Sequence, residues 1–436
     1  MIKCERAKVV NNMISKNDKE IVDEAKKIAS SEGESKLPRS IWIVGIVSFF
    51  SNIASVVVTA FSPEFIINIL GGTTAEMGYI RGISEALSYL MKVFSGVISD
   101  WMGKRKILML FGYLCAAFAK PMFACCRGLG LYVSAQVLER ITNGLRDTPR
   151  DALIADCAPK GLKGAAYGLR QSCAFLGSMV GSILAFCCLL YFGASEIVIR
   201  CVYLVMSIPL FVAVLLIYFG IKEPKGLRGL KNRKGFPIKK EDVKQLGANF
   251  WFYMFVCFIF LCSRYSESFL VYRAQELGME LKYAPLVLAV MYLFNSPTAN
   301  ILGNWSDKHE RKLCLAFGFC MMLASCIVMA FATQVWHVMV GVAIYGIHYG
   351  ATQGTFYALV SDYSPAHIKG TSIGIFNLIY CLGISVSNVL TGEFWRHFGP
   401  ELSFMVMSGF AFTSTVMVLF IKPKTKDNVA IADQKN

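Results

Sequence analysis

The sequence predicts an all-α membrane protein with twelve transmembrane helices in two homologous six-helix bundles. Three observations predict this fold class. Hydrophobic residues make up 55% of the 436 residues and charged residues only 17%, whereas a soluble domain carries about 25% charge. The apolar residues gather in segments long enough to cross a bilayer, which takes about 20 residues. The second half of the chain also repeats charged motifs of the first half.

Twelve apolar segments are expected to span the membrane as helices. Lipid offers no hydrogen-bond partner to a free backbone group, so a span is either a helix or part of a closed barrel. A barrel strand is only about 10 residues long and alternates in polarity, whereas these segments are longer and uniformly apolar. The expected spans are residues 41–67, 77–99, 107–126, 130–157, 164–192, 198–220, 248–271, 283–304, 313–333, 335–361, 370–392 and 402–421.

The clearest repeated motif is a short charged turn between two apolar segments. It reads Gly96-Val-Ile-Ser-Asp100-Trp-Met-Gly103-Lys104-Arg105-Lys106 in the first half and Gly303-Asn-Trp-Ser-Asp307-Lys-His-Glu-Arg311-Lys312 in the second. A second motif, at 151–168, recurs at 357–374. We therefore expect an N-terminal bundle at 41–220 and a C-terminal bundle at 247–421. A basic linker at 221–246 joins them, and tails occupy 1–40 and 422–436.

The position of the basic residues predicts the orientation in the membrane. The segment from Lys222 to Lys244 holds nine Lys or Arg residues against three acids, while the alternate turns at 68–75 and 193–196 hold almost none. Cytoplasmic loops carry such an excess of Lys and Arg. We expect both termini and the linker in the cytoplasm. The net charge of +15 thus indicates a lipid bilayer as the partner rather than nucleic acid.

The charged turn resembles a family motif. Gly-x-x-x-Asp-x-x-Gly-x-Arg-Lys between the second and third helices is similar to the loop motif of major facilitator superfamily (MFS) transporters. Arg140-Ile-Thr-Asn-Gly144 resembles the fourth-helix motif of that family, whose Arg is associated with proton coupling, and the run from Arg146 to Asp156 resembles one found in a poorly characterised group of bacterial members. The resemblance covers residues 38–422. It implies a monomer in the bacterial inner (plasma) membrane, with a small-molecule solute bound between the two halves and H+ as the coupling ion.

Charged residues within the expected spans are the candidate solute and coupling residues, because a charge in the membrane is costly and usually functional. On the fourth helix they follow two neighbouring stripes. Basic groups outnumber acidic ones, so we expect a solute with an anionic group. A proton on Asp147 or Glu85 would offset the excess positive charge when the solute leaves. The candidates are Glu85, Lys92, Arg140, Arg146, Asp147 and Arg170.

A second set of residues is expected to form a cytoplasmic gate, in which arginines and carboxylates hold the two halves together. An alternative is that the basic turns only fix the topology, and that the ion pairs of the fourth helix never touch solute. The expected gate residues are Gly96, Asp100, Gly103, Arg105, Arg150, Asp151, Asp156, Asp307, Arg311 and Asp362. Four further charges form either an outer gate or interface anchors; these are Glu64, Arg264, Glu267 and Arg273.

These features predict a secondary active transporter that moves a small polar or anionic organic solute by alternating access, coupled to protons. One alternative is an exporter of drugs or other amphipathic compounds with the same fold. Another is a transporter-like sensor or scaffold, although the expected soluble segments are too short to form a signalling domain. The sequence shows no catalytic constellation, phosphate-binding loop or set of metal ligands, so we expect neither an enzyme nor a cofactor.

Overall fold

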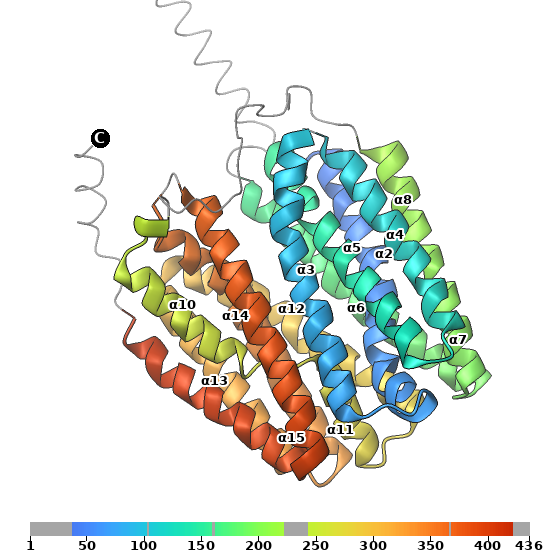
Figure 1. Cartoon of the computed structure of the whole chain (residues 1–436). Coiled ribbons are helices and arrows are strands. Elements are labelled where there is room, and N and C mark those ends of the chain that lie inside the picture. The colour runs from blue at the N-terminus through green and yellow to red at the C-terminus, as the bar shows by residue number, and fades with distance from the viewer. Residues whose placement is uncertain (1–36, 103, 159–161, 222–242, 366–367, 422–436) are drawn as a thin grey trace, which may run out of the picture.

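The computed structural model describes residues 37–102, 104–158, 162–221, 243–365 and 368–421. Within these ranges every regular element is a helix and no strand is present. Figure 1 shows long, roughly parallel helices that lie in two groups. The prediction of an all-helical membrane fold is therefore confirmed.

The helices of the first half match the first six expected spans within a few residues. They are α2 (Arg39–Pro63) with the π-helical turn η1 (Glu64–Ile69), α3 (Thr74–Met102), α4 (Arg105–Cys125), α5 (Leu129–Cys157), α6 (Lys163–Phe192), α7 (Glu196–Val205) and α8 (Ser207–Gly220). The sixth expected span corresponds to α7 and α8 together, which are separated only by Met206.

The second half departs from the expected spans at two places. Its helices are α10 (Ala248–Leu261), α11 (Glu267–Glu276), the short η2 (Leu281–Tyr283), α12 (Ala284–Lys308), α13 (Arg311–Ala330), α14 (Val335–Asp362) and α15 (Lys369–Leu419). The seventh span is broken between α10 and α11. The last two spans run on as α15 with one bend at Gly399, whose φ of 85° is readily adopted only by glycine.

Seven of the described helical segments are long and apolar enough to cross a membrane. Neither α3 nor α5 is among them, although each has 29 residues. Both carry several charged residues along one face, and a helix that lines a polar interior need not be apolar all round. The 28-residue α14 is not among the seven either, but α3 and α5 are the two that carry most of the candidate site.

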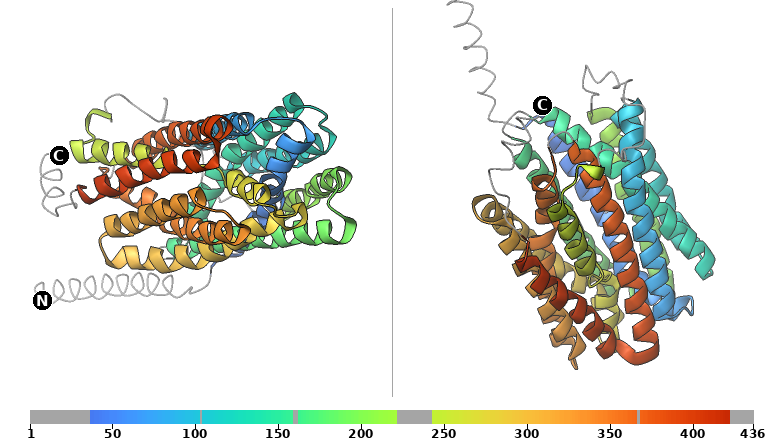
Figure 2. Two further views of the ribbon diagram at one scale, coloured as in Figure 1. Left: turned by 90° about the horizontal axis from the view of Figure 1, so that it is seen from below. Right: turned by 60° about the vertical axis from the view of Figure 1, so that its left-hand side comes forward.

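The two halves of the chain meet along a small number of helix pairs. The most extensive seam joins α3 to α15, a second joins α6 to α12, and α2 also touches α11 and α12. Both panels of Figure 2 show α15 running beside α3. We call the end of the molecule where Ile221 and Val243 flank the linker the linker end, and the opposite end the far end.

The halves are closed at the far end. There Gly78 of α3 lies against Asn388 and Gly392 of α15 so closely that an added Cβ would be 2.4 Å from the Asn388 carbonyl oxygen. One turn further along, the Ser385 hydroxyl donates to the Gly82 carbonyl at 3.1 Å. These contacts all fall in the first half of α3, which begins at the far end.

At the linker end the described ion pairs stay within one half. Arg105 Nε lies 2.8 Å from Asp156 Oδ2 in the first half, and Arg311 Nη1 lies 2.7 Å from Asp362 Oδ2 in the second. In Figure 1 the helices of the two halves are likewise closer together near α11 than at the other end. The structure is therefore closed at the far end and more open toward the linker end.

Candidate functional site

The candidate site is centred on α5, which packs closely against α3. Gly144 makes this possible, because a Cβ there would lie 2.3 Å from the Ser88 carbonyl oxygen. The close approach places charges of the two helices opposite one another. Arg140 Nη1 lies 2.8 Å from Glu85 Oε1. Two helical turns further on, Lys92 Nζ lies 3.6 Å from Asp147 Oδ2.

The second of these pairs belongs to a network of three cations and two carboxylates. Arg150 lies between the two acids, with Nη1 2.8 Å from Asp147 and Nε 3.0 Å from Asp151. Arg170 of α6 approaches Asp151 at 3.8 Å. Lys92 and Asp147 keep 23% and 24% of their side-chain exposure although they lie far from the helix ends. This exposure indicates a water-accessible space between the halves.

The structure brings five of the six predicted solute and coupling residues to this inner surface and places Arg146 elsewhere. The Arg146 guanidinium lies 4.4 Å from the centre of the Tyr113 ring of α4, and the residue is only 4% exposed. It is therefore packed between α4 and α5 and points away from the other half. The prediction that Arg146 faces the solute has no support in this arrangement.

The same α4–α5 interface contains an ion pair that the sequence reading missed. Lys120 Nζ lies 2.7 Å from Glu139 Oε1, and their side chains are 0% and 4% exposed. Ser55 of α2 donates to the same oxygen at 3.3 Å. A lone lysine inside an apolar span was the available signal, because a charge within a span needs a partner.

Aromatic rings link the two halves at the inner limit of the far-end seam. Tyr89 of α3 stacks on Tyr380 of α15 with ring centres 4.1 Å apart. The Tyr380 hydroxyl accepts a hydrogen bond from Arg264, whose guanidinium also lies 4.0 Å from the Tyr349 ring centre. On the other side, Lys92 Nζ lies 4.3 Å from the Tyr89 ring centre. Cations and tyrosines thus alternate across the boundary.

Arg264 lies in the break between α10 and α11, and tertiary contacts hold this break open. The Asn388 side chain accepts from the Ser266 backbone N–H at 2.9 Å, and the Ser266 hydroxyl caps α11. Glu267 is the first residue of α11. Arg264 and Glu267 therefore belong to the interior rather than to an outer gate.

The other two charges that were left open lie at the far end. Arg273 is 3.3 Å from Glu276 and donates to the Ala332 carbonyl at 2.8 Å. Glu64 accepts from Asn68 at 2.7 Å and from Gln275 of the second half at 3.3 Å. Glu64 therefore contributes to the far-end closure between the halves.

The predicted gate residues are only partly described. Arg105, Asp156, Arg311 and Asp362 form the two pairs given above, and Gly96 lies where a Cβ would be 3.2 Å from the Thr148 methyl group. Gly103 and the side chains of Asp100 and Asp307 lie outside the described residues. A contact between the halves through these gate residues is thus untested.

Basic groups exceed acidic ones in the interior of the first half by three, seven against four. The basic set is Arg81, Lys92, Lys120, Arg140, Arg146, Arg150 and Arg170, and the acidic set is Glu85, Glu139, Asp147 and Asp151. Arg81 is 1% exposed, and two of its guanidinium nitrogens have no hydrogen-bond partner. Its third nitrogen and Arg140 Nε can both donate at 3.3 Å to the Gln136 amide oxygen, in the orientation that satisfies both.

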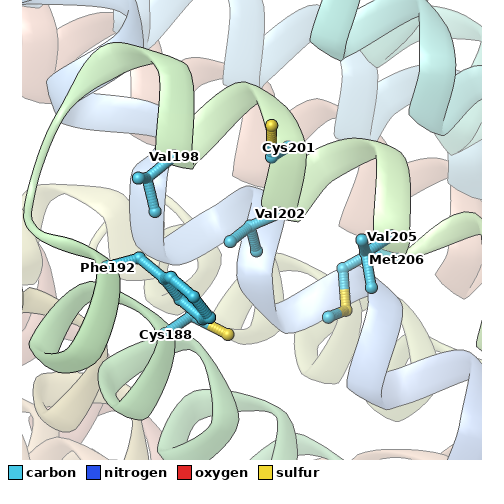
Figure 3. Close-up of a pocket in the computed structure, with 7 residues that line it drawn as sticks. All are labelled: Cys188, Phe192, Val198, Cys201, Val202, Val205 and Met206. Carbon is cyan, nitrogen blue, oxygen red and sulfur yellow. The ribbon is translucent and has the colours of Figure 1, made fainter.

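Outside the charged interior, the structure contains an apolar pocket between α6 and α7, shown in Figure 3. The side chains that line it offer no charge or amide to select a polar solute. These residues are Cys188, Phe192, Val198, Cys201, Val202, Val205 and Met206. The described part of the chain contains no group of three His, Cys, Asp or Glu side chains placed to hold a metal ion.

Comparison with known proteins places this arrangement in a family. The model of the Major Facilitator Superfamily matches residues 41–388 and 301–435. An uncharacterized MFS-type transporter of Methanocaldococcus jannaschii is 28% identical over 399 residues, which cover 90% of this chain and 97% of that protein. The lysosomal dipeptide transporter MFSD1 of Bos taurus is 24% identical over 183 residues, or 41% of this chain and 39% of that protein.

Solved structures share the fold. A POT family transporter in complex with 5-aminolevulinic acid superposes with a TM-score of 0.75 at 12% identity, over 89% of this chain and 96% of that one. The nucleoside transporter NupG superposes with a TM-score of 0.73 at 9% identity, over 88% of this chain and 100% of that one. At such identities the likeness concerns the fold alone.

Proposed function

Because the chain belongs to the Major Facilitator Superfamily of transporters, we propose that it moves a small solute with an anionic group by alternating access, coupled to protons. Membership supports secondary transport as the general activity. The chain is likewise a multi-pass membrane protein. The charge of the solute, the coupling ion and the orientation are our proposals.

The observation that carries the anionic solute is the one positive charge in excess between α3, α5 and α6, where four cations face three carboxylates: Lys92, Arg140, Arg150 and Arg170 against Glu85, Asp147 and Asp151. An uncompensated charge away from water is costly. A bound anion would offset part of this cost, and Lys92 and Arg170 lie where a solute entering from the linker end would meet them. A dipeptide, the solute named for MFSD1, carries a carboxylate and so falls within this class.

Proton coupling is proposed to use Asp147 or Glu85. Each carboxylate is paired with cations in the present arrangement, Asp147 with Arg150 and Lys92, and Glu85 with Arg140. A neighbouring positive charge favours the ionised carboxylate, and loss of that neighbour favours the protonated form. If solute binding or closure of the linker end draws the cations away, either acid becomes able to take up a proton.

Alternating access would exchange closure at the far end for closure at the linker end. The far-end seam of α3 and α15 is made of small residues, which separate without breaking ion pairs. The predicted gate motifs lie at the linker end and would meet in the opposite state. By the excess of basic residues around the linker, that end faces the cytoplasm, and the membrane is the plasma membrane of a bacterium.

The test is untargeted metabolite uptake and efflux by proteoliposomes that contain the purified protein, with and without a pH gradient. We expect the transported compounds to carry an anionic group, and their accumulation to depend on the gradient. Lys92→Gln should reduce uptake, whereas Lys282→Gln, at a partly exposed residue outside the site that pairs with Glu280, should not. Transport of uncharged or purely cationic compounds, unaffected by Lys92→Gln, would exclude the anionic solute.

A further inference from the structure

Glu267 is an interior carboxylate without a partner. It is the first residue of α11 and is half-buried. Among the residues that the structure describes, it takes part in no hydrogen bond and no ion pair. By contrast, four other interior carboxylates are each engaged by a cation: Glu85, Glu139, Asp147 and Asp151. A half-buried carboxylate that is left unpaired calls for a cation from outside the described chain.

The surroundings of Glu267 suit a cation. It lies close enough to Tyr292 and Tyr349 of the second half and to Arg140 of the first half for its charge to act on them, so it lies at the boundary between the halves. Aromatic rings attract a cation that lies over their faces. Arg140 does not neutralise Glu267, because its guanidinium is held by Glu85 at 2.8 Å.

The two remaining basic groups near Glu267 are withdrawn from the open space. Arg264 is 4% exposed and lies between Tyr349 and Tyr380. Arg81 is equally inaccessible and lies against Gln136. Toward the closed end, then, the accessible charges are the neutral pair of Glu85 with Arg140 and the single negative charge of Glu267.

The accessible charges toward the linker end have the opposite sign. Three cations face two carboxylates there, which leaves one positive charge in excess; these are Lys92, Arg150, Arg170, Asp147 and Asp151. Seven residues separate Glu85 from Lys92 on α3, and also Arg140 from Asp147 on α5. At 1.5 Å per residue this places the two charged levels about 10 Å apart.

We propose that Glu267 binds a cationic group of the solute, and that the solute is therefore a zwitterion. Its ammonium or similar group lies against Glu267 near the closed end, and its anionic group lies near Lys92 and Arg170. This inference rests on the proposed function and adds a second charge to the solute. It also predicts a length, because a solute that reaches both levels needs its charges several bonds apart.

The experiment measures binding of simple probes to the purified full-length protein by calorimetry. The zwitterionic probes are ω-amino acids of rising length: glycine, aminobutyrate, aminohexanoate and aminooctanoate. Acetate, butyrate, hexanoate and octanoate are the matched anions without the ammonium group. We expect the affinity of the zwitterions relative to their matched anions to rise with length, reaching roughly tenfold or more, which corresponds to about 1.4 kcal/mol.

Glu267→Gln should abolish this preference and leave the binding of the matched anions unchanged. Glu280→Gln is the control, because Glu280 lies outside the site, just beyond the end of α11, and pairs with Lys282 in an exposed position. Glu267→Asp should retain part of the preference. The thermal stability of each ligand-free variant establishes that it is folded.

Two results would overturn the inference: equal binding of zwitterions and matched anions by the wild type, or a preference that persists in Glu267→Gln. Lys92→Gln separates this inference from the proposed function, since it should weaken zwitterions and anions alike. Anion binding that is weakened by Lys92→Gln without any zwitterion preference leaves the proposed function standing and refutes only the role of Glu267. Zwitterion binding that requires Glu267 but ignores Lys92→Gln supports the inference and refutes the anionic contact.

Discussion

Removal of Lys120 should destabilise the first half of the protein strongly. Lys120 and Glu139 are separated by 2.7 Å and almost completely buried, so Lys120→Met would leave the Glu139 carboxylate with only the Ser55 hydroxyl as a partner. Breaking a buried ion pair in this way costs about 3–5 kcal/mol. With about 2 °C per kcal/mol, the value for larger domains, the unfolding temperature should fall by about 6–10 °C.

The double variant Lys120→Met with Glu139→Gln provides the decisive comparison. It removes both charges, keeps a side-chain oxygen for Ser55, and should recover most of the lost stability, because replacing a buried pair as a whole is often nearly neutral. Thermal unfolding in detergent, followed by intrinsic fluorescence, measures the four corners of this double-mutant cycle. Glu280→Gln, at an exposed ion pair, controls for loss of any carboxylate and should have little effect.

The reasoning would be refuted if Lys120→Met destabilised the protein no more than Glu280→Gln does. It would also fail if the double variant lost as much stability as the two single variants added together. Either result would mean that the two charges are not coupled in the folded protein.

The remaining predictions concern transport and conformation. Gly78→Leu should keep the far end from closing, because its Cβ would lie 2.4 Å from the Asn388 carbonyl oxygen; labelling of cysteines introduced along α15 from the far side should rise, and unchanged labelling would contradict the seam. Asp147→Asn should abolish proton-driven accumulation while solute exchange without a gradient persists; unchanged accumulation would exclude Asp147 and make Glu85 the next candidate. Asp100→Asn should reduce transport at normal expression by weakening the linker-end gate, and normal transport would show that no such gate exists. Single cysteines in the linker should resist thiol reagents added outside intact cells, and strong labelling would reverse the proposed orientation.

The helices could be predicted from the sequence because the membrane imposes a length and a polarity on each span. The break between α10 and α11 could not. Residues 262–266 include neither proline nor glycine, the usual local signals of a helix end. The break depends on the Asn388 side chain of α15, more than 100 residues away, which accepts from the Ser266 N–H. Such a tertiary contact leaves no trace in the local sequence.

The residues that make up the candidate site could largely be predicted from the sequence, but the neighbouring helix that each of them contacts could not. The charged stripes predicted on α5 contain most of the residues that form the site. Glu85 pairs with Arg140 and Lys92 pairs with Asp147 because the two residues on each helix are seven positions apart and the helices pack together. Arg146 falls on the same half of α5, yet its guanidinium lies over the ring of Tyr113 of α4. Helical periodicity gives angles around one helix and cannot say which neighbour occupies each angle.

The closed end was also beyond sequence analysis. A transporter sequence must be compatible with both states, so the motifs of the linker end predict a gate there although the structure closes the far end. Glycines at Gly78, Gly82 and Gly392 become informative only once their opposing backbone atoms are known.

Alternating access itself can be tested at one contact between the halves. Cys381 of α15 already lies with its Sγ 3.4 Å from the Ala86 carbonyl oxygen of α3. In Ala86→Cys, oxidation should form a disulfide across the far-end seam, and the pair Ala86→Cys with Cys381→Ser is the control that cannot form it. Uptake by proteoliposomes should stop on oxidation and return on reduction only in the variant that has both cysteines. Undiminished uptake with the cross-link in place would contradict transport by separation of the two halves at the far end.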